Sequence, residues 1–115
     1  MTRQEIFTKV YKHLMKQGRK ALSTHGGCQY RSPYGLKCAI GCLIPNGLYD
    51  PEWDNYGTGV TIILTESKEL TKLLGGRRNV NMLQSLQSVH DDNKVEYWKE
   101  ALEKAAKKHG MEIPT

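Results

Sequence analysis

The chain has 115 residues, with 17 Lys and Arg against 12 Asp and Glu, a formal net charge of +5 and a pI near 9.2. This length fits a single domain, residues 1–115, large enough to bury a core of its own. No apolar run approaches the roughly 18 residues of a membrane span, and the first residues follow an amphipathic pattern that differs from a signal peptide, so we expect a soluble, cytoplasmic protein whose three cysteines are free thiols.

The first predicted element is a helix from about residue 2 to 17. Thr2-Arg-Gln-Glu5 has the form of a capping box, and apolar residues follow it at helical spacing. Gly18 is the expected end of this helix.

All three cysteines lie in the next segment, residues 28–45, which we call the knuckle. Its pattern predicts a short strand at 29–31, a type I turn at 32–35 with Pro in its second position, and then a return strand or a short buried helix over 37–44. The small residues Ala39 and Gly41 suit a segment pressed against other backbone. Pro45-Asn-Gly47 ends it.

Residues 49–59 have the composition of a loop whose aromatic residues could form a small satellite cluster. Residues 60–74 are ambiguous, because the first five are apolar and β-branched while the rest follow a helical rhythm that ends at Gly75-Gly76. We favour helix for this segment.

Two further helices are predicted near the C-terminus. Asn79 is the expected cap of the first, and Asn93 with Glu96 the expected cap of the second, which Gly110 ends. Their apolar faces are predicted to point inward: Val80, Leu83, Leu86 and His90 in the first, Val95, Trp98, Leu102 and Ala105 in the second. The fold class that follows is mainly α, or α+β with little β, with four or five helices and a small hairpin or knuckle at about 28–44.

The cysteines suggest two kinds of chemistry. His25, Cys28, Cys38 and Cys42 form an H-x2-C-x9-C-x3-C set that zinc would accept, although neither end has the C-x2-C pair typical of zinc knuckles. Alternatively, one cysteine is a nucleophile with His90 as its base and Asp91 or Asp92 nearby. Against both stands the preference of cysteine for buried, apolar surroundings, which favours inert core thiols.

A ligand site is a further hypothesis, because Gln87 and His90 share a face with leucines, where polar groups need partners. The knuckle backbone, or Tyr30 and Arg31, are the natural partners, in a buried structural network or in a site. A cleft lined by Arg31, Lys37 and His90 would favour a small anionic ligand. The candidate binding residues are Tyr30, Arg31, Lys37, Gln87, His90 and Asp91.

Nucleic-acid binding is suggested by the net charge and by a series of basic residues at Lys9, Lys12, Lys16, Arg19 and Lys20. Candidate stacking groups are Tyr30, Tyr34, Trp53 and Tyr56. The alternative is an ordinary solvated helix face.

The chain contains the knuckle pattern C-x-Y-R-x-P-x-G-x-K-C-A-x-G-C-L-I-P, Tyr49-Asp-Pro51, Leu83-x-x-Leu-Gln-x-x-His-Asp91 and Trp98. In these residues it resembles a family of small, largely uncharacterised proteins from phages and bacterial genomes. The resemblance implies a phage or prophage setting and a shared motif cluster, but no reaction. We therefore expect an accessory protein that acts by binding a host protein, a nucleotide-like ligand or nucleic acid, in an infected or lysogenic bacterium. The alternative is a small enzyme or zinc protein built on Cys28, Cys38 and Cys42 with His90.

Overall fold

The computed structural model describes residues 1–114. It contains six α-helices joined by short 3-10 turns: α1 (Arg3–Gln17), α2 (Glu52–Asn55), α3 (Val60–Glu66), α4 (Lys68–Leu73), α5 (Val80–Asp92) and α6 (Trp98–His109). The predicted mainly α class is confirmed, with six helices where four or five were expected. None of the helices within residues 1–114 is long and apolar enough to cross a membrane.

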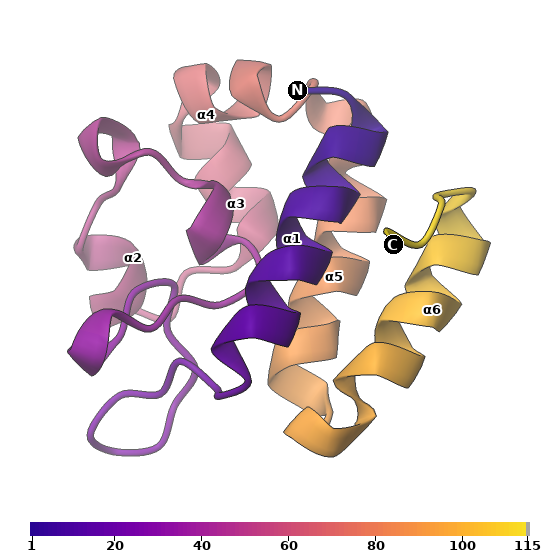
Figure 1. Cartoon of the computed structure of the whole chain (residues 1–115). Helices are drawn as coiled ribbons and strands as arrows, with labels where there is room; N and C mark the ends of the chain where they lie inside the picture. Colours follow the sequence, from indigo (N-terminus) through magenta and orange to yellow (C-terminus); the bar gives the residue numbers. More distant parts are fainter. Residues whose placement is uncertain (115) are drawn as a thin grey trace.

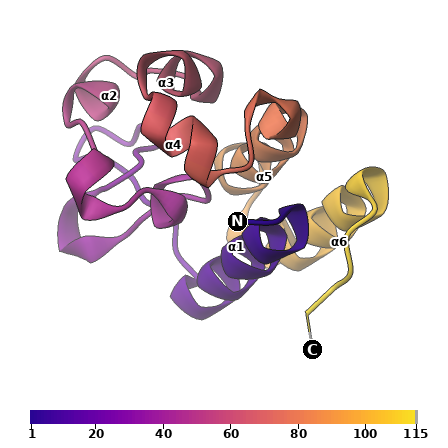
Figure 2. The ribbon, with the colours of Figure 1, turned by 90° about the horizontal axis from the view of Figure 1, so that it is seen from above.

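The helices form two groups. The long helices α1, α5 and α6 contact one another, and they lie on one side of the molecule, while the knuckle and α2 to α4 lie on the other (Figures 1 and 2). Side chains from both groups meet in one buried cluster, to which α1 contributes Ile6, Phe7, Val10 and Leu14. The knuckle is therefore held against the face that α1 and α5 present to it.

Helix α1 begins and ends as its sequence predicts. The Thr2 hydroxyl accepts the Glu5 N–H at 3.1 Å, and the Glu5 carboxylate accepts the Thr2 N–H at 2.8 Å, which completes the capping box. Gly18 ends the helix in the left-handed conformation at φ 59°.

The knuckle differs from the predicted hairpin. Within residues 1–114, the β pairing consists of two isolated bridges, Leu22 with Cys28 and Arg31 with Lys37. Of the two alternatives predicted for 37–44, the short buried helix is the one that forms, as a 3-10 turn at Gly41–Leu43. The turn at 32–35 has Tyr34 at φ 69° and ψ 20°, which is the geometry of a type II turn in its third position, so the type I prediction was wrong. Burial differs along the knuckle: the turn at 33–35 is exposed, the bridged residues Arg31 and Lys37 are half-buried, and residues 38–41 are buried in the core.

The next segment is more helical than its composition indicated. Residues 49–59, predicted as a loop, include α2, whose Trp53 is buried in the main core. Residues 60–74 are helical as favoured, but they divide into α3 and α4 at Ser67, whose hydroxyl accepts the Leu70 N–H and caps α4.

Asn79 lies at the N-cap position of α5 as predicted, but neither it nor Asn93 makes the predicted capping hydrogen bond, because each side chain bonds elsewhere. The buried Asn79 amide donates to the Leu74 carbonyl at 2.7 Å and its oxygen accepts from Arg3 at 2.7 Å. Asn93 donates back to carbonyls at the end of α5. Both side chains therefore close helix C-termini and do not cap the helices that follow.

Candidate functional site

The six predicted binding residues do not form one site, although three of them, Tyr30, Gln87 and Asp91, line the same small cavity. Gln87, His90 and Asp91 lie at the end of α5, Tyr30 and Arg31 lie at the base of the knuckle, and Lys37 lies against α1. The predicted cleft lined by Arg31, Lys37 and His90 is not formed, because His90 is fully buried.

His90 occupies the centre of a buried network. The Ala21 N–H donates to its Nε2 at 2.9 Å, so Nε2 is the unprotonated nitrogen and Nδ1 carries the proton, which it donates to Asp91 Oδ1 at 2.7 Å. The ring also stacks on Trp98, with 5.4 Å between the ring centres. With both nitrogens engaged, His90 has no free lone pair for a metal ion or for deprotonating a thiol.

Gln87 completes this network and joins it to the knuckle. Its side-chain oxygen accepts the Ile40 N–H at 3.0 Å, and its amide donates to Asp91 at 3.3 Å. The sequence-based expectation that polar residues on this helix face meet the knuckle backbone is thus confirmed for Gln87. His90 instead meets the backbone of Ala21, just before the knuckle.

The four predicted zinc ligands are not gathered. Within residues 1–114, the one group of potential metal ligands is Cys28, His90 and Asp91, whose ligand atoms lie within 4.8 Å of one another. Cys38 accepts the Gly41 N–H, and Cys42 donates to the Ala39 carbonyl. Burial raises the pKa of both thiols to about 12, as expected of cysteines that pack and do not react.

Cys28 is exposed, but it should react slowly with electrophiles. Partial burial of its thiol, reinforced by the Asp91 carboxylate, raises its pKa to about 11. At pH 8 we expect alkylation by iodoacetamide about a hundredfold slower than in the urea-unfolded chain, and a rate that rises about tenfold per pH unit up to pH 11. Mass spectrometry of timed samples measures both. A fast rate that does not change above pH 7 would instead indicate an activated nucleophile.

Tyr30 and Arg31 are fixed by a carboxylate that the sequence analysis did not single out, Asp54 of α2. Asp54 accepts the Tyr30 N–H at 2.6 Å, the Arg31 N–H at 3.1 Å and the Tyr49 hydroxyl. The Arg31 guanidinium lies 4.3 Å from the Tyr49 ring centre and donates to the Ile44 carbonyl. No sequence pattern distinguishes Asp54 from the neighbouring acidic residues; its role depends on tertiary contacts.

A small cavity of about 160 Å³ separates the Asp54 network from the His90 network. Its lining includes Asp54 and Asp91, together with Cys28 and Gln87. Two carboxylates in so small a space oppose an anionic ligand. We therefore interpret the predicted binding residues around this cavity as stabilising the fold and not as binding a small anion.

Lys37 belongs to a different surface. Its backbone is clamped to α1, because its N–H donates to Gln17 and its carbonyl accepts from Gln17 and His13, all at 2.8 to 3.0 Å. Burial, with Lys37 and Lys9 nearby, lowers the pKa of His13, so this ring is neutral at neutral pH. Lys37 and Lys9 line the same hollow, of about 420 Å³.

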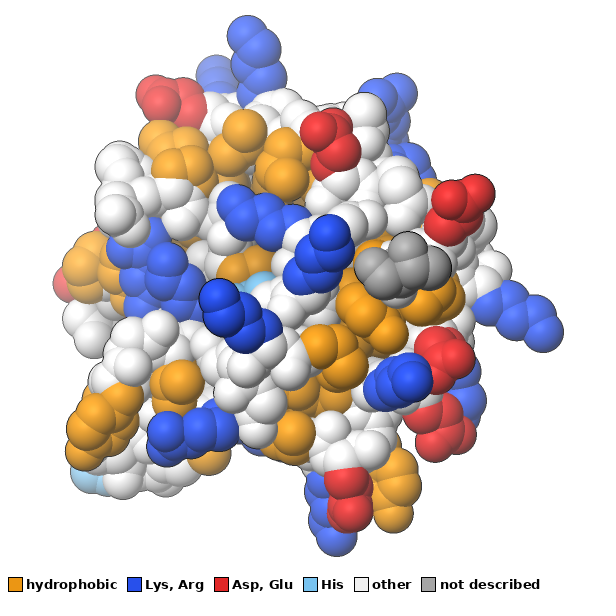
Figure 3. All heavy atoms as spheres, in the orientation of Figure 1, with side chains coloured by type: hydrophobic (Ala, Val, Ile, Leu, Met, Phe, Trp, Pro, Cys, Tyr) orange, Lys and Arg blue, Asp and Glu red, His pale blue; other side chains and the backbone are white. Residues whose placement is uncertain are grey.

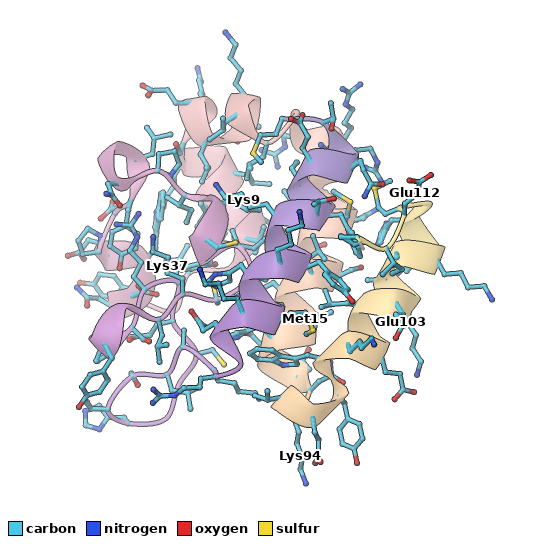
Figure 4. The ribbon with its side chains drawn as sticks, in the orientation of Figure 1. Lys9, Met15, Lys37, Lys94, Glu103 and Glu112 are labelled. Carbon is cyan, nitrogen blue, oxygen red and sulfur yellow. The ribbon has the colours of Figure 1, made fainter. Side chains whose placement is uncertain are left out.

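We call Lys9, Lys12, Lys16 and Lys37 the cationic face. The three lysines of α1 recur every three or four residues and so share one side of the helix. In Figure 3, Lys and Arg side chains gather over the middle of α1 and the segment beside it, and Figure 4 shows Lys9 and Lys37 on this side. The only Lys or Arg ion pair within residues 1–114 joins Lys104 to Glu100, so the cationic face is not neutralised by carboxylates.

A second hollow, of about 710 Å³, lies between α5 and α6. Its basic residues are Arg3, Arg78, Lys104, Lys108 and His109. Several of these are already engaged: Arg3 donates to Asn79, Arg78 to the Gly75 carbonyl, and Lys104 pairs with Glu100. The partners of Arg3 and Arg78 are neutral and only Lys104 is paired with a carboxylate, so among residues 1–114 this hollow has three unpaired Lys and Arg charges and the cationic face has four.

Neither a scan against protein-family models nor searches of curated proteins and of solved structures found a match to this chain.

Proposed function

We propose that the protein acts by binding, without catalysis, and that its partner is a nucleic acid held by the cationic face. The observation that carries this proposal is a set of four exposed or half-exposed lysines with no carboxylate partner, on a chain of net charge +5. In the setting that the sequence resemblance implies, the protein is an accessory factor of a phage or prophage in a bacterial host.

Binding is favoured over catalysis because the candidate catalytic groups are used internally. Both ring nitrogens of His90 are hydrogen-bonded, one to Ala21 and the other to Asp91. The raised pKa of Cys28, Cys38 and Cys42 keeps these thiols protonated at neutral pH.

A nucleic acid is favoured over a small anion because the charges are spread out. Lys9 and Lys16 are seven residues apart on α1, which separates them by about 10 Å along the helix. Along the axis of a double helix, where each strand has one phosphate per roughly 3.4 Å of rise, that length spans about three phosphates of one strand. A small anion needs donors that converge on one point, whereas a row of lysines follows a chain of phosphates.

Charge reversal of the cationic face tests this proposal. We expect the triple variant Lys9→Glu, Lys12→Glu and Lys16→Glu to bind a labelled oligonucleotide about tenfold or more weakly, and the log–log salt dependence of its affinity to be shallower by about 2. Fluorescence anisotropy titrations between about 50 and 200 mM salt measure both quantities.

The matched control reverses three lysines elsewhere, Lys68, Lys94 and Lys99, which are all exposed and lie at helix N-termini where Glu is well tolerated. It has the same net charge as the first variant. If both variants lose affinity equally, the effect comes from net charge alone and the cationic face is not the site. If the wild type binds no oligonucleotide, nucleic acid is not the partner.

A further inference from the structure

Tyr34, at the tip of the knuckle turn, combines two unusual properties. Its side chain is 91% exposed. Its backbone has φ 69°, and it is the one residue other than glycine with positive φ in the part of the chain that the structure describes. A bulky L-residue rarely adopts this conformation, because its Cβ crowds the following carbonyl oxygen. The fold therefore accepts backbone strain at a position where the side chain packs against nothing.

The turn that carries Tyr34 is firmly held at its base. The Ser32 N–H donates to the Leu36 carbonyl at 2.9 Å, and Arg31 pairs with Lys37 in a β-bridge. Lys37 is in turn clamped to α1 by Gln17 and His13. The ring of Tyr34 is thus presented by a fixed support and not by a loose loop.

The same support places Tyr34 beside the cationic face. Tyr34 is three residues from Lys37, which keeps their Cα atoms within about 10 Å of each other. Proteins that bind single strands combine a basic surface that follows the backbone with aromatic rings on which unpaired bases stack. Of the other predicted stacking groups, Tyr30 and Trp53 are buried and thus unable to stack on a base.

We infer that the ligand of the cationic face is a single-stranded nucleic acid and that Tyr34 stacks on one of its unpaired bases. This inference rests on the proposed function, since it assigns the ligand class to the same face. In a duplex the bases are already stacked on one another, so the ring of Tyr34 would find no unpaired base to stack on.

The test compares a labelled single strand with a hairpin duplex of the same length, for wild type, Tyr34→Ala and Tyr34→Phe. We expect the single strand to bind more tightly than the duplex, and Tyr34→Ala to weaken single-strand binding about fivefold or more while duplex binding hardly changes. Tyr34→Phe keeps the ring and should retain the affinity. Tyr34→Gly should lose the same affinity with an equal or higher Tm, because glycine relieves the strain.

Tyr56→Ala is the matched control. Tyr56 is 80% exposed, and no hydrogen bond within residues 1–114 joins its segment to α1, so its loss should not change single-strand binding. Wild-type affinity for the single strand in Tyr34→Ala, or a preference for the duplex, would overturn this inference and leave the proposed function in place if the cationic-face variant still loses binding. Absence of any nucleic-acid binding would overturn both.

Discussion

Replacing Gly41 by alanine should destabilise the protein by roughly 3 kcal/mol or more, a large fraction of the roughly 5 to 15 kcal/mol by which domains of this kind are stable. A Cβ at this position would lie 1.9 Å from the Tyr30 carbonyl oxygen and 2.8 Å from its carbonyl carbon. Both are backbone atoms, so no rotamer change relieves the overlap. The two segments of the knuckle would have to separate, and Tyr30 is held from its other side by Asp54.

Gly47→Ala is the matched control for this prediction. Gly47 lies in the same region, has no atom within 4 Å of an added Cβ, and is not among the glycines with positive φ. Its replacement should leave stability unchanged or raise it by up to about 1 kcal/mol, because alanine lowers the entropy of the unfolded chain. Urea unfolding of both variants measures the difference. A Gly41→Ala variant as stable as Gly47→Ala would show that the knuckle is not packed as described.

The sequence was most informative where local rules decide the structure. The capping box at Thr2 and Glu5 and the glycine that ends α1 depend only on neighbouring residues, and they were predicted correctly. The small residues of the knuckle also indicated close backbone contact, which Gly41 makes with Tyr30. These features need no knowledge of distant partners.

Prediction failed where a distant partner overrides the local preference. Asn79 is of a residue type that favours helix caps. Its side chain instead makes buried hydrogen bonds with the Leu74 carbonyl and the Arg3 guanidinium, and it could not make them while capping α5. Asp54 has no pattern of its own, and it becomes central only because α2 folds back on the knuckle.

The candidate site shows the same division. The sequence identified His90, Asp91 and Gln87 as polar residues that require partners, but it could not show whether these partners are protein groups or a ligand. The structure assigns them to Ala21, Ile40 and one another. The lysines of α1 share a helix face that periodicity predicts, whereas the addition of Lys37 to that face depends on the tertiary clamp by Gln17.

The His90 network gives the second large effect: His90→Ala should cost about 3 to 5 kcal/mol in the free energy of unfolding. The substitution leaves a cavity beside Trp98, deprives the Ala21 N–H of its acceptor, and removes the proton that Asp91 accepts. His90→Gln restores an acceptor near the Nε2 position but not the stacking, so the order of stability should be wild type, then Gln, then Ala. Urea unfolding followed by tryptophan fluorescence measures this order.

His25 provides the control, because it is exposed and its ring makes no hydrogen bond within residues 1–114, so His25→Ala should change stability by less than about 0.5 kcal/mol. The folded His90→Gln variant should also bind the oligonucleotide as wild type does, because the cationic face contains none of the atoms that the substitution changes. If His90→Ala were as stable as wild type, the ring would be free for chemistry and the enzymatic alternative would regain support. If His90→Gln were stable but did not bind the oligonucleotide, His90 would belong to the binding site. The ligand would then lie at the 160 Å³ cavity lined by Cys28 and not on α1.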